Sequence, residues 1–203
     1  LAIQNDEFVI YYQPRAFARN GEFASMEALV RWRDPHRGLI SPADFIPIAE
    51  QSRLIIPLGD LVIRKVCKQL AIWREQGSML RPVSINVSAL QLIDDGLRLS
   101  ITKNLDHYNL PTSLVAIELT ESSMLDETGI AIDELKRLHD MGIELQIDDF
   151  GTGYSSLSYL KQFPIDKLKI DKSFISEIPS SNTDIAITKT IIALAKGLGI
   201  EVI

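Results

Sequence analysis

The sequence lacks the features of several protein classes, and each absence narrows its function. Its only cysteine, Cys67, lies in the run LVIRKVCKQLAIW, where apolar residues recur with helical spacing, so we expect a buried, reduced thiol rather than half of a disulfide. No uninterrupted apolar stretch approaches the roughly 20 residues of a membrane-spanning helix. The start of the chain also lacks the charged and apolar regions of a signal peptide. We therefore expect a cytoplasmic location, with tethering to the inner membrane by segments outside this chain left open.

Positive charge and histidine are also scarce. The chain has 21 Lys and Arg against 27 Asp and Glu, a net charge of -6, which argues against binding polymeric nucleic acid. A small anionic substrate stays compatible with this charge if metal ions supply the positive charge. His36, His107 and His139 show no metal-ligand spacing and no nucleophile partner, so we interpret them as structural or surface residues.

Short β-branched or aromatic runs alternate with longer amphipathic runs, which is typical of strand–helix units around a parallel sheet. With 203 residues, 46% of them hydrophobic, the chain can bury the core of one globular domain. We expect seven strands, at residues 8–12, 26–32, 83–88, 114–119, 143–148, 167–171 and 200–203.

The connections between these strands carry helix and turn signals. Ser41 followed by Pro42 predicts an N-cap and the first helical position. Two further helices are expected in residues 60–77 and 184–199, which both end in glycine. The first two strands are joined by QPRAFARNGEF, which contains turn residues but no helical period. We therefore expect them to form an antiparallel hairpin ahead of the parallel units.

Polar side chains recur near the carboxyl ends of five strands. The period of two along residues 26–32 places Glu27, Leu29 and Arg31 on one face. The polar groups at the five strand ends are Glu27, Asn86, Glu118, Asp148, and Lys169 with Asp171. An open sheet would spread them along a row, whereas a TIM-type barrel brings its strand ends into one pocket. The pattern therefore favours an α/β, TIM-like (β/α) barrel.

Carboxylates gathered in one pocket repel one another and lose hydration, an objection that a divalent cation removes. Three carboxylates and an amide oxygen suit Mg²⁺ or Mn²⁺ rather than zinc. Asp149 could reach a second ion, and two ions commonly assist displacement at phosphorus. Lys169 would hold or polarise the attacking water or screen the phosphate, and Arg31 would clamp a phosphate oxygen.

Each of these residues could also have a purely structural role. Other kinds of catalytic or nucleotide-binding motif fit the sequence less well. A single strand-end carboxylate is more often a solvated contact or a helix cap, and Lys169 with Asp171 is also compatible with a simple ion pair. The agreement of five strands favours the joint site. The GTG sequence at 151–153 lacks dinucleotide-fold and P-loop spacing, and GYSSL is not a G-x-S-x-G elbow.

These motifs, in this order, resemble the EAL-domain family of bacterial cyclic di-GMP phosphodiesterases. The resemblance extends over essentially the whole chain and is carried by EALVRW (27–32), NVS (86–88), ELTE (118–121), DDFGTGYSSL (148–157) and KID (169–171), with further similarity in YYQP (11–14) and GLISPADFIPIAE (38–50). It implies a TIM-like barrel whose first strand is antiparallel. It also implies Mg²⁺- or Mn²⁺-dependent hydrolysis, with two ions, of one phosphodiester bond of cyclic di-GMP to linear pGpG.

The resemblance also implies roles for individual residues. Glu27, Asn86, Glu118 and Asp148 resemble first-metal ligands, Asp149 a second-metal ligand, and Lys169 the lysine near the nucleophilic water, with Asp171 supporting that region. The catalytic set is thus Lys169, Glu27 and Asp149, and the substrate-lining set is Gln13, Leu29, Arg31 and Asn86. Glu121 resembles the glutamate that tethers the DFGTG loop, where Gly151 and Gly153 permit bending. In the family this loop couples dimerisation to metal binding.

The sequence departs from the family at its C-terminus. Family members continue into an Ala-Glu-Gly-Val-Glu motif, an eighth strand and a last helix, whereas this chain stops at Ile203. We therefore expect residues 1–203 to be a single EAL-type domain, C-terminally incomplete before the last strand and helix and inactive as a fragment if that glutamate motif is required. LAIQNDEF at the start resembles the end of a helix from an upstream GGDEF or sensory domain.

Three functions are compatible with these features. The first is a cyclic di-GMP phosphodiesterase acting as a homodimer, because every motif position present retains the required residue type. The second is a catalytically inactive cyclic di-GMP receptor, which would lack the glutamate of the Ala-Glu-Gly-Val-Glu motif. The third, a partner-binding or dimerisation module, would leave the acidic pocket without a role.

Overall fold

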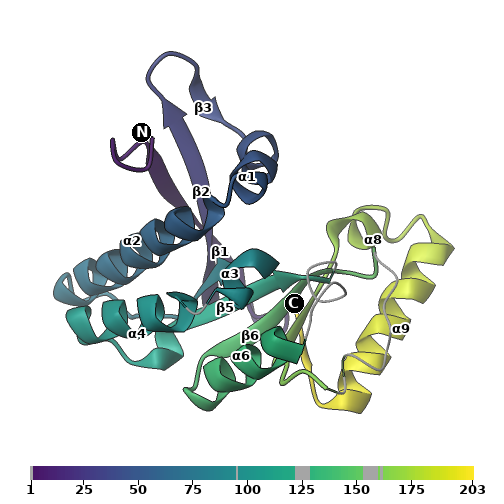
Figure 1. The fold of residues 1–203 in the computed structure, drawn as a ribbon. Coiled ribbons are helices and arrows are strands. Elements are labelled where there is room, and N and C mark those ends of the chain that lie inside the picture. Colours follow the sequence, from purple (N-terminus) through teal and green to yellow (C-terminus); the bar gives the residue numbers. More distant parts are fainter. Residues whose placement is uncertain (1, 95, 122–128, 153–159, 161) are drawn as a thin grey trace. The chain divides into compact units, whose positions relative to one another are not determined.

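The computed structural model describes residues 2–94, 96–121, 129–152, 160 and 162–203. It divides the chain into two compact units, unit 1 at Leu1–Ala116 and unit 2 at Ile117–Ile203. Strands and helices alternate in both, and the sheet is mostly parallel, as the sequence pattern predicts (Figure 1). In the described part of the chain, no helix is both long and apolar enough to span a membrane.

Unit 1 begins with three antiparallel strands. Strand β1 (Phe8–Ala16) pairs with β2 (Phe23–Asp34), which confirms the expected hairpin, and both strands extend beyond their predicted limits. The short strand β3 (Gly38–Ile40), absent from the prediction, pairs with the end of β2. Three residues are too few to display a period of two, and the turn before β3 is closed by Gly38 at φ +77. Strand β4 (Val83–Asn86) then pairs with β2 in parallel.

Four α-helices complete the described part of unit 1. Helix α1 (Pro42–Gln51) follows the predicted N-cap Ser41, although the Ser41 side chain makes no capping hydrogen bond. Helix α2 (Ile55–Glu75) begins before the predicted run, because a proline at position 57 is tolerated in the first turn. Helices α3 (Ala89–Ile93) and α4 (Gly96–Tyr108) follow, and α4 packs beside α2 (Figure 1). A 3₁₀ turn, Thr112–Leu114, leads into the next strand.

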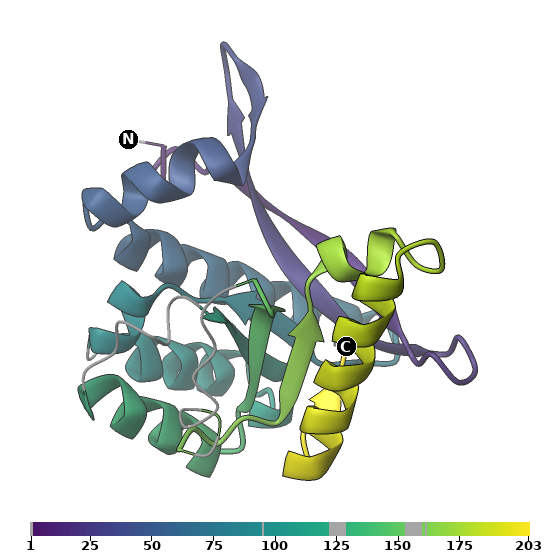
Figure 2. The ribbon, with the colours of Figure 1, turned by 90° about the vertical axis from the view of Figure 1, so that its right-hand side faces the viewer.

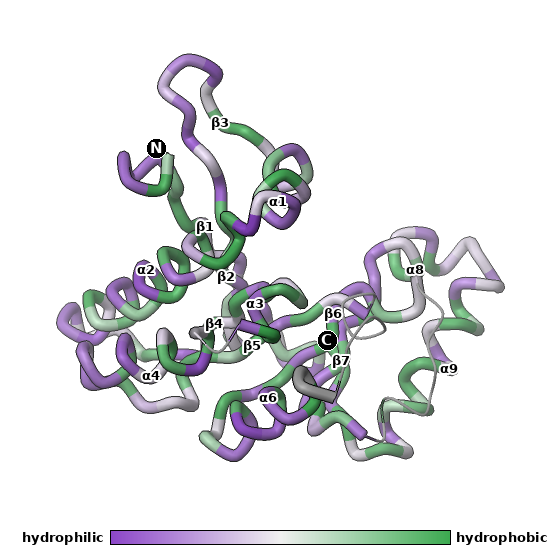
Figure 3. The backbone as a smooth tube through the Cα atoms, in the orientation of Figure 1, coloured by the Kyte–Doolittle hydropathy of each residue, from purple (hydrophilic) through white to green (hydrophobic). Residues whose placement is uncertain are grey.

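One hydrophobic core cluster of unit 1 lies between the hairpin and the first two helices. The Phe8 ring stacks on Trp32 with centroids 5.7 Å apart, and the Phe45 ring from α1 lies 5.5 Å from Phe8. Val30 and Trp32 pack against this cluster, as expected for the face of β2 opposite Glu27. Cys67 of α2 is fully buried, which confirms its predicted burial. Figure 3 shows apolar and polar residues alternating along α2.

Strand β5 (Val115–Thr120) starts in unit 1 and continues into unit 2. Unit 2 then contains α6 (Gly129–Asp140), β6 (Glu144–Phe150), β7 (Lys167–Ile170), α8 (Lys172–Ser176), α9 (Asn182–Leu198) and β8 (Glu201–Val202). Strands β6, β7 and β8 pair in parallel. Helix α9 packs on β7 and β8 (Figure 2) and ends at Gly199, whose φ of +74 confirms the expected glycine C-cap.

The predicted strands therefore all occur, with boundaries shifted by up to four residues. The three histidines lie at helix ends or in a turn: His107 packs against Tyr108, and His139 contacts Asp166 at 3.5 Å. His36 is an exposed turn residue whose N–H donates to Asp34. These positions agree with the structural or surface role expected for them.

Candidate active site

Glu27 is the centre of the site residues in unit 1. Glu27 is only 6% exposed and lies next to the buried Ala28 in β2. The Arg15 Nη2 atom lies 2.8 Å from Glu27 Oε2, and Asn86 Nδ2 donates to Glu27 Oε1 at 3.0 Å. The predicted site residues Glu27 and Asn86 are therefore in direct contact. The guanidinium of Arg15 also contacts the Glu27 carboxylate.

Arg15 was not among the residues predicted from the sequence. In the hairpin register Gln13 lies opposite Glu27, and Arg15 lies two residues further along β1, opposite Ser25. Side chains two residues apart in a strand share a face, so Arg15 and Gln13 are on the face of Glu27. The sequence pattern predicts the first strand only to Tyr12, and extending its alternation by three residues would have found Arg15.

The three predicted substrate-lining residues of the hairpin occupy neighbouring register positions. Leu29 pairs with Tyr11, Arg31 pairs with Val9, and Gln13 is exposed. The Arg31 guanidinium donates to the Val30 carbonyl at 2.8 Å and lies 5.9 Å from the centroid of the Tyr11 ring. The ring contact holds the guanidinium by a cation–π interaction while its remaining N–H groups stay available to a ligand.

Lys169 is the centre of the site residues in unit 2. Its ammonium donates to Glu118 Oε1 at 2.9 Å and to Asp148 Oδ2 at 3.0 Å. Glu118 is fully buried, and one of its carboxylate oxygens lies within 4.8 Å of one from Asp148. The three residues come from β5, β6 and β7, so the expected convergence of strand-end groups is present within this unit.

Asp149 and Asp171 lie beside this cluster and have different environments. Asp149 adopts a left-handed φ of 53°, and its N–H donates to Asp148 Oδ1 at 2.7 Å. Partial desolvation, and then the charges of Asp148 and Asp171, raise the pKa of Asp149 to about 6. Asp171 instead caps α8 by accepting from the backbone N–H of Ser173 at 2.9 Å, and its hydrogen bonds with Ser173 lower its pKa.

The contacts of Lys169 and Asp171 also test the alternative that these two residues form only an ion pair with each other. The ammonium of Lys169 contacts Glu118 and Asp148, while the carboxylate of Asp171 accepts from Ser173 at the start of α8. The two residues are two positions apart in the sequence, but their side chains contact different partners. The placement of Lys169 between two carboxylates agrees with the joint site better than with that pair.

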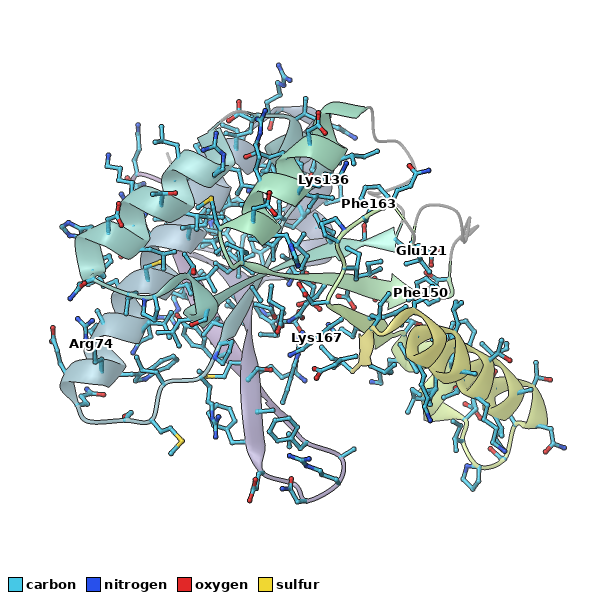
Figure 4. All side chains as sticks on the ribbon, turned by 90° about the horizontal axis from the view of Figure 1, so that it is seen from below. Arg74, Glu121, Lys136, Phe150, Phe163 and Lys167 are labelled. Atoms are coloured by element: carbon cyan, nitrogen blue, oxygen red, sulfur yellow. The ribbon has the colours of Figure 1, made fainter. Side chains whose placement is uncertain are left out.

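Glu121 links the end of β5 to the turn after β6. Its Oε2 atom accepts from the Gly151 N–H at 2.8 Å, and Figure 4 shows Glu121 and Phe150 at neighbouring strand ends. Gly151 has φ +101, and an added Cβ would lie 2.9 Å from the Phe174 ring. A side chain is therefore disfavoured there by both backbone and packing. Gly153, the other predicted bending residue, lies outside the described residues.

The donor atoms fit a hard divalent cation. Glu118 and Asp148 offer carboxylate oxygens close enough to share an ion, and Glu27 and Asn86 offer a carboxylate and an amide in contact. Oxygen donors of this kind favour Mg²⁺ or Mn²⁺. Lys169 contributes one positive charge beside the two carboxylates that it contacts, and a divalent cation there would compensate more of their charge.

The family follows from a match over the complete chain. The model of the EAL domain family matches residues 1–203. The chain belongs to the EAL domain family. Relatives of this EAL domain include "Cyclic di-GMP phosphodiesterase PdeR" of Escherichia coli K12, 43% identical over 100% of the chain, and the bifunctional diguanylate cyclase/cyclic di-GMP phosphodiesterase MucR of Pseudomonas aeruginosa, 39% identical over 100% of the chain. The EAL domain spans about 30% of the length of each of these relatives.

Solved structures agree with this assignment. The structure described as "PaMucR Phosphodiesterase, c-di-GMP complex" is 39% identical and superposes with a TM-score of 0.92, over 99% of this chain and 81% of that one. The FimX EAL domain of Pseudomonas aeruginosa is 22% identical, and its TM-score of 0.89 reflects the shared fold over 99% of this chain and 80% of that one. The EAL domain therefore has the predicted TIM-barrel-like α/β fold, with an antiparallel first strand.

Proposed function

We propose that this EAL domain hydrolyses one phosphodiester bond of cyclic di-GMP to linear pGpG, in a reaction that requires Mg²⁺ or Mn²⁺. The observation that carries the proposal is the Lys169 ammonium placed between the carboxylates of Glu118 and Asp148. Relatives about 40% identical that are named cyclic di-GMP phosphodiesterases support it. A related structure described as a complex with c-di-GMP supports the substrate.

Each predicted metal ligand has a role in this proposal. Glu27, Asn86, Glu118 and Asp148 bind the first ion, and Asp149 binds the second. Bound divalent ions lower the pKa of a coordinated water and neutralise charge on the phosphate. The roles of these ligands rest on their oxygen donors and on their match to the family's motif positions.

The remaining residues act on water and phosphate. Lys169 holds the attacking water in position and offsets charge that develops on the phosphate oxygens. Its ammonium is already oriented by two carboxylates, so little reorganisation is needed when the substrate arrives. Arg31 binds a phosphate oxygen, and Gln13, Leu29 and Asn86 contact the nucleotide. Asp171 keeps the strand end after Lys169 in place by capping α8.

The setting of the domain is part of the proposal. The protein works as a cytoplasmic homodimer, with an upstream GGDEF or sensory domain that controls the hydrolysis. The length of the curated relatives, of which this chain spans about 30%, supports further domains.

The deciding experiment incubates the full-length protein with cyclic di-GMP and Mg²⁺ or Mn²⁺ and follows pGpG by chromatography. We expect pGpG with the wild type and none with Glu27→Ala, because the variant loses a metal ligand. Glu75→Ala removes an exposed glutamate at the end of α2 and serves as the control, with wild-type turnover. If calorimetry detects binding of cyclic di-GMP but neither metal gives pGpG, the protein is a receptor instead.

A further inference from the structure

The ion pair between Arg15 and Glu27 is shielded from solvent. The two side chains are 11% and 9% exposed, and Arg15 Nη2 lies 2.8 Å from Glu27 Oε2. An exposed ion pair holds its partners weakly, because water and salt compete for both charges. At this degree of burial, the charge-assisted hydrogen bond fixes where the carboxylate lies.

Both oxygens of the Glu27 carboxylate have a donor from a neighbouring strand. Arg15 of β1 donates to Oε2, and Asn86 of β4 donates to Oε1 at 3.0 Å. The carboxylate is thus oriented from two sides.

The antiparallel hairpin fixes the backbone position of Arg15. Residues Phe8 to Arg15 of β1 pair with β2 in unbroken register, and the irregularity of the ladder comes only after Arg15. The Arg15 side chain therefore starts from a backbone position held by the antiparallel ladder. A guanidinium remains charged at any physiological pH and has a planar fork of donors, which suits it to hold one carboxylate orientation.

We infer that Arg15 is a positioning residue, which orients the Glu27 carboxylate for the divalent cation of the proposed reaction. This inference rests on the proposed function, in which Glu27 binds metal. Arg15 itself touches neither the ion nor the substrate in this scheme. Its guanidinium also repels a divalent ion, so its removal has two opposed effects on metal affinity. We expect the loss of orientation to dominate, because Arg15 contacts the Glu27 carboxylate directly.

The test measures Mn²⁺ binding to the full-length protein from the electron paramagnetic resonance signal of free Mn²⁺. We expect Arg15→Met to weaken Mn²⁺ binding about 10- to 100-fold, the usual effect of removing a hydrogen-bond partner of a metal ligand. Arg15→Lys keeps the charge but not the fork, and we expect an intermediate loss. Arg19→Met is the matched control in the same hairpin. Arg19 is exposed and stacks on Phe17, so this variant should bind Mn²⁺ like the wild type.

The outcomes separate this inference from the proposed function. If Glu27→Ala weakens Mn²⁺ binding but Arg15→Met leaves it unchanged or tightens it, the inference on Arg15 is wrong and the metal site stands. If Glu27→Ala binds Mn²⁺ like the wild type, the metal-site assignment itself fails. Circular dichroism checks that each variant is folded. Should Arg15→Met not fold, unchanged Mn²⁺ affinity in folded Arg15→Lys would overturn the inference.

Discussion

Units 1 and 2 hold their site carboxylates in different ways. In unit 1, one carboxylate, Glu27, meets the planar guanidinium of Arg15. In unit 2, two carboxylates, Glu118 and Asp148, meet the single ammonium of Lys169. A guanidinium suits a fixed geometry, whereas an ammonium is a compact point charge on a flexible stem. We interpret the difference as a division of roles, in which Arg15 orients one carboxylate and Lys169 compensates the charge of two.

The burial of the two cations supports this division. The Arg15 side chain is 11% exposed and the Lys169 side chain 24% exposed, although Glu118 beneath it is completely buried. Lys169 therefore has one side open to solvent and another in contact with buried charge. A cation in that position can neutralise carboxylates and reach a ligand from the same place.

The largest expected effect comes from removing the shared cation of unit 2. We expect Lys169→Met to lower the free energy of unfolding of the metal-free protein by about 3 kcal/mol, because buried Glu118 and neighbouring Asp148 lose their common partner. Urea unfolding followed by circular dichroism measures the change. The variant should also form no pGpG.

A lysine on the surface of α9 provides the control for this substitution. Lys196 is exposed, so Lys196→Met should change the free energy of unfolding by less than about 0.5 kcal/mol. An equal effect of both substitutions would show that the ammonium of Lys169 does not compensate the two carboxylates, and the comparison between the units would fail.

Two glycines compare a closely packed position in unit 1, Gly59, with an open surface position in unit 2, Gly197. A Cβ at Gly59 would lie 1.9 Å from Gln91 Nε2, and Gln91 is buried with its Oε1 accepting from the Ser88 N–H. Gly59→Ala must displace that side chain and break the capping of α3, two residues beyond Asn86. We expect a loss of about 1–3 kcal/mol in a urea titration.

Gly197 in α9 is the matched position. An added Cβ meets nothing within 4 Å there, so Gly197→Ala should stabilise the protein by up to about 1 kcal/mol through helix propensity. If Gly59→Ala is also neutral or stabilising, Gln91 moves aside without loss and the close packing around α3 is not needed.

The smallest effect concerns Cys67, whose reactivity reports on unit 1 alone. Burial raises the pKa of this thiol to about 12, so at pH 8 even less of it is thiolate than of an ordinary cysteine. We expect iodoacetamide to label it far more slowly in the native protein than in denaturant, as measured by mass spectrometry. Rapid labelling of the native protein would mean that α2 opens readily.

Much of the fold was predictable because its signals are local. All seven expected strands occur, the glycine C-cap of α9 lies at Gly199, and the hairpin follows from a connection without helical period. The sequence did not predict strand β3 or the early start of α2, because their residue patterns are short or ambiguous. Both are decided by pairing and packing with the hairpin rather than by their own residues.

The candidate site was predictable as a set of residues but not as a set of contacts. The alternation of polar residues at strand ends identified Glu118, Asp148 and Lys169. The sequence left Asp171 as an alternative partner for Lys169, because neighbours along the chain are visible in a sequence. Its observed partner Glu118 is 51 residues away, and only the adjacency of strands in the sheet brings them together. Arg15 was missed because the predicted strand was too short.

The hairpin has a further consequence, for the order in which the charged contacts of the two units form. Arg15 and Glu27 are separated by 12 residues, so one turn closes the loop between them, whereas Lys169 and Glu118 enclose 51 residues. Closing the longer loop has a larger entropic penalty, by about 1 kcal/mol, before any contact is made. During synthesis from the N-terminus, the hairpin can orient Glu27 before the ribosome has added Lys169. The Glu27 carboxylate of unit 1 is thus oriented early, and the contacts of Lys169 with Glu118 and Asp148 in unit 2 form later.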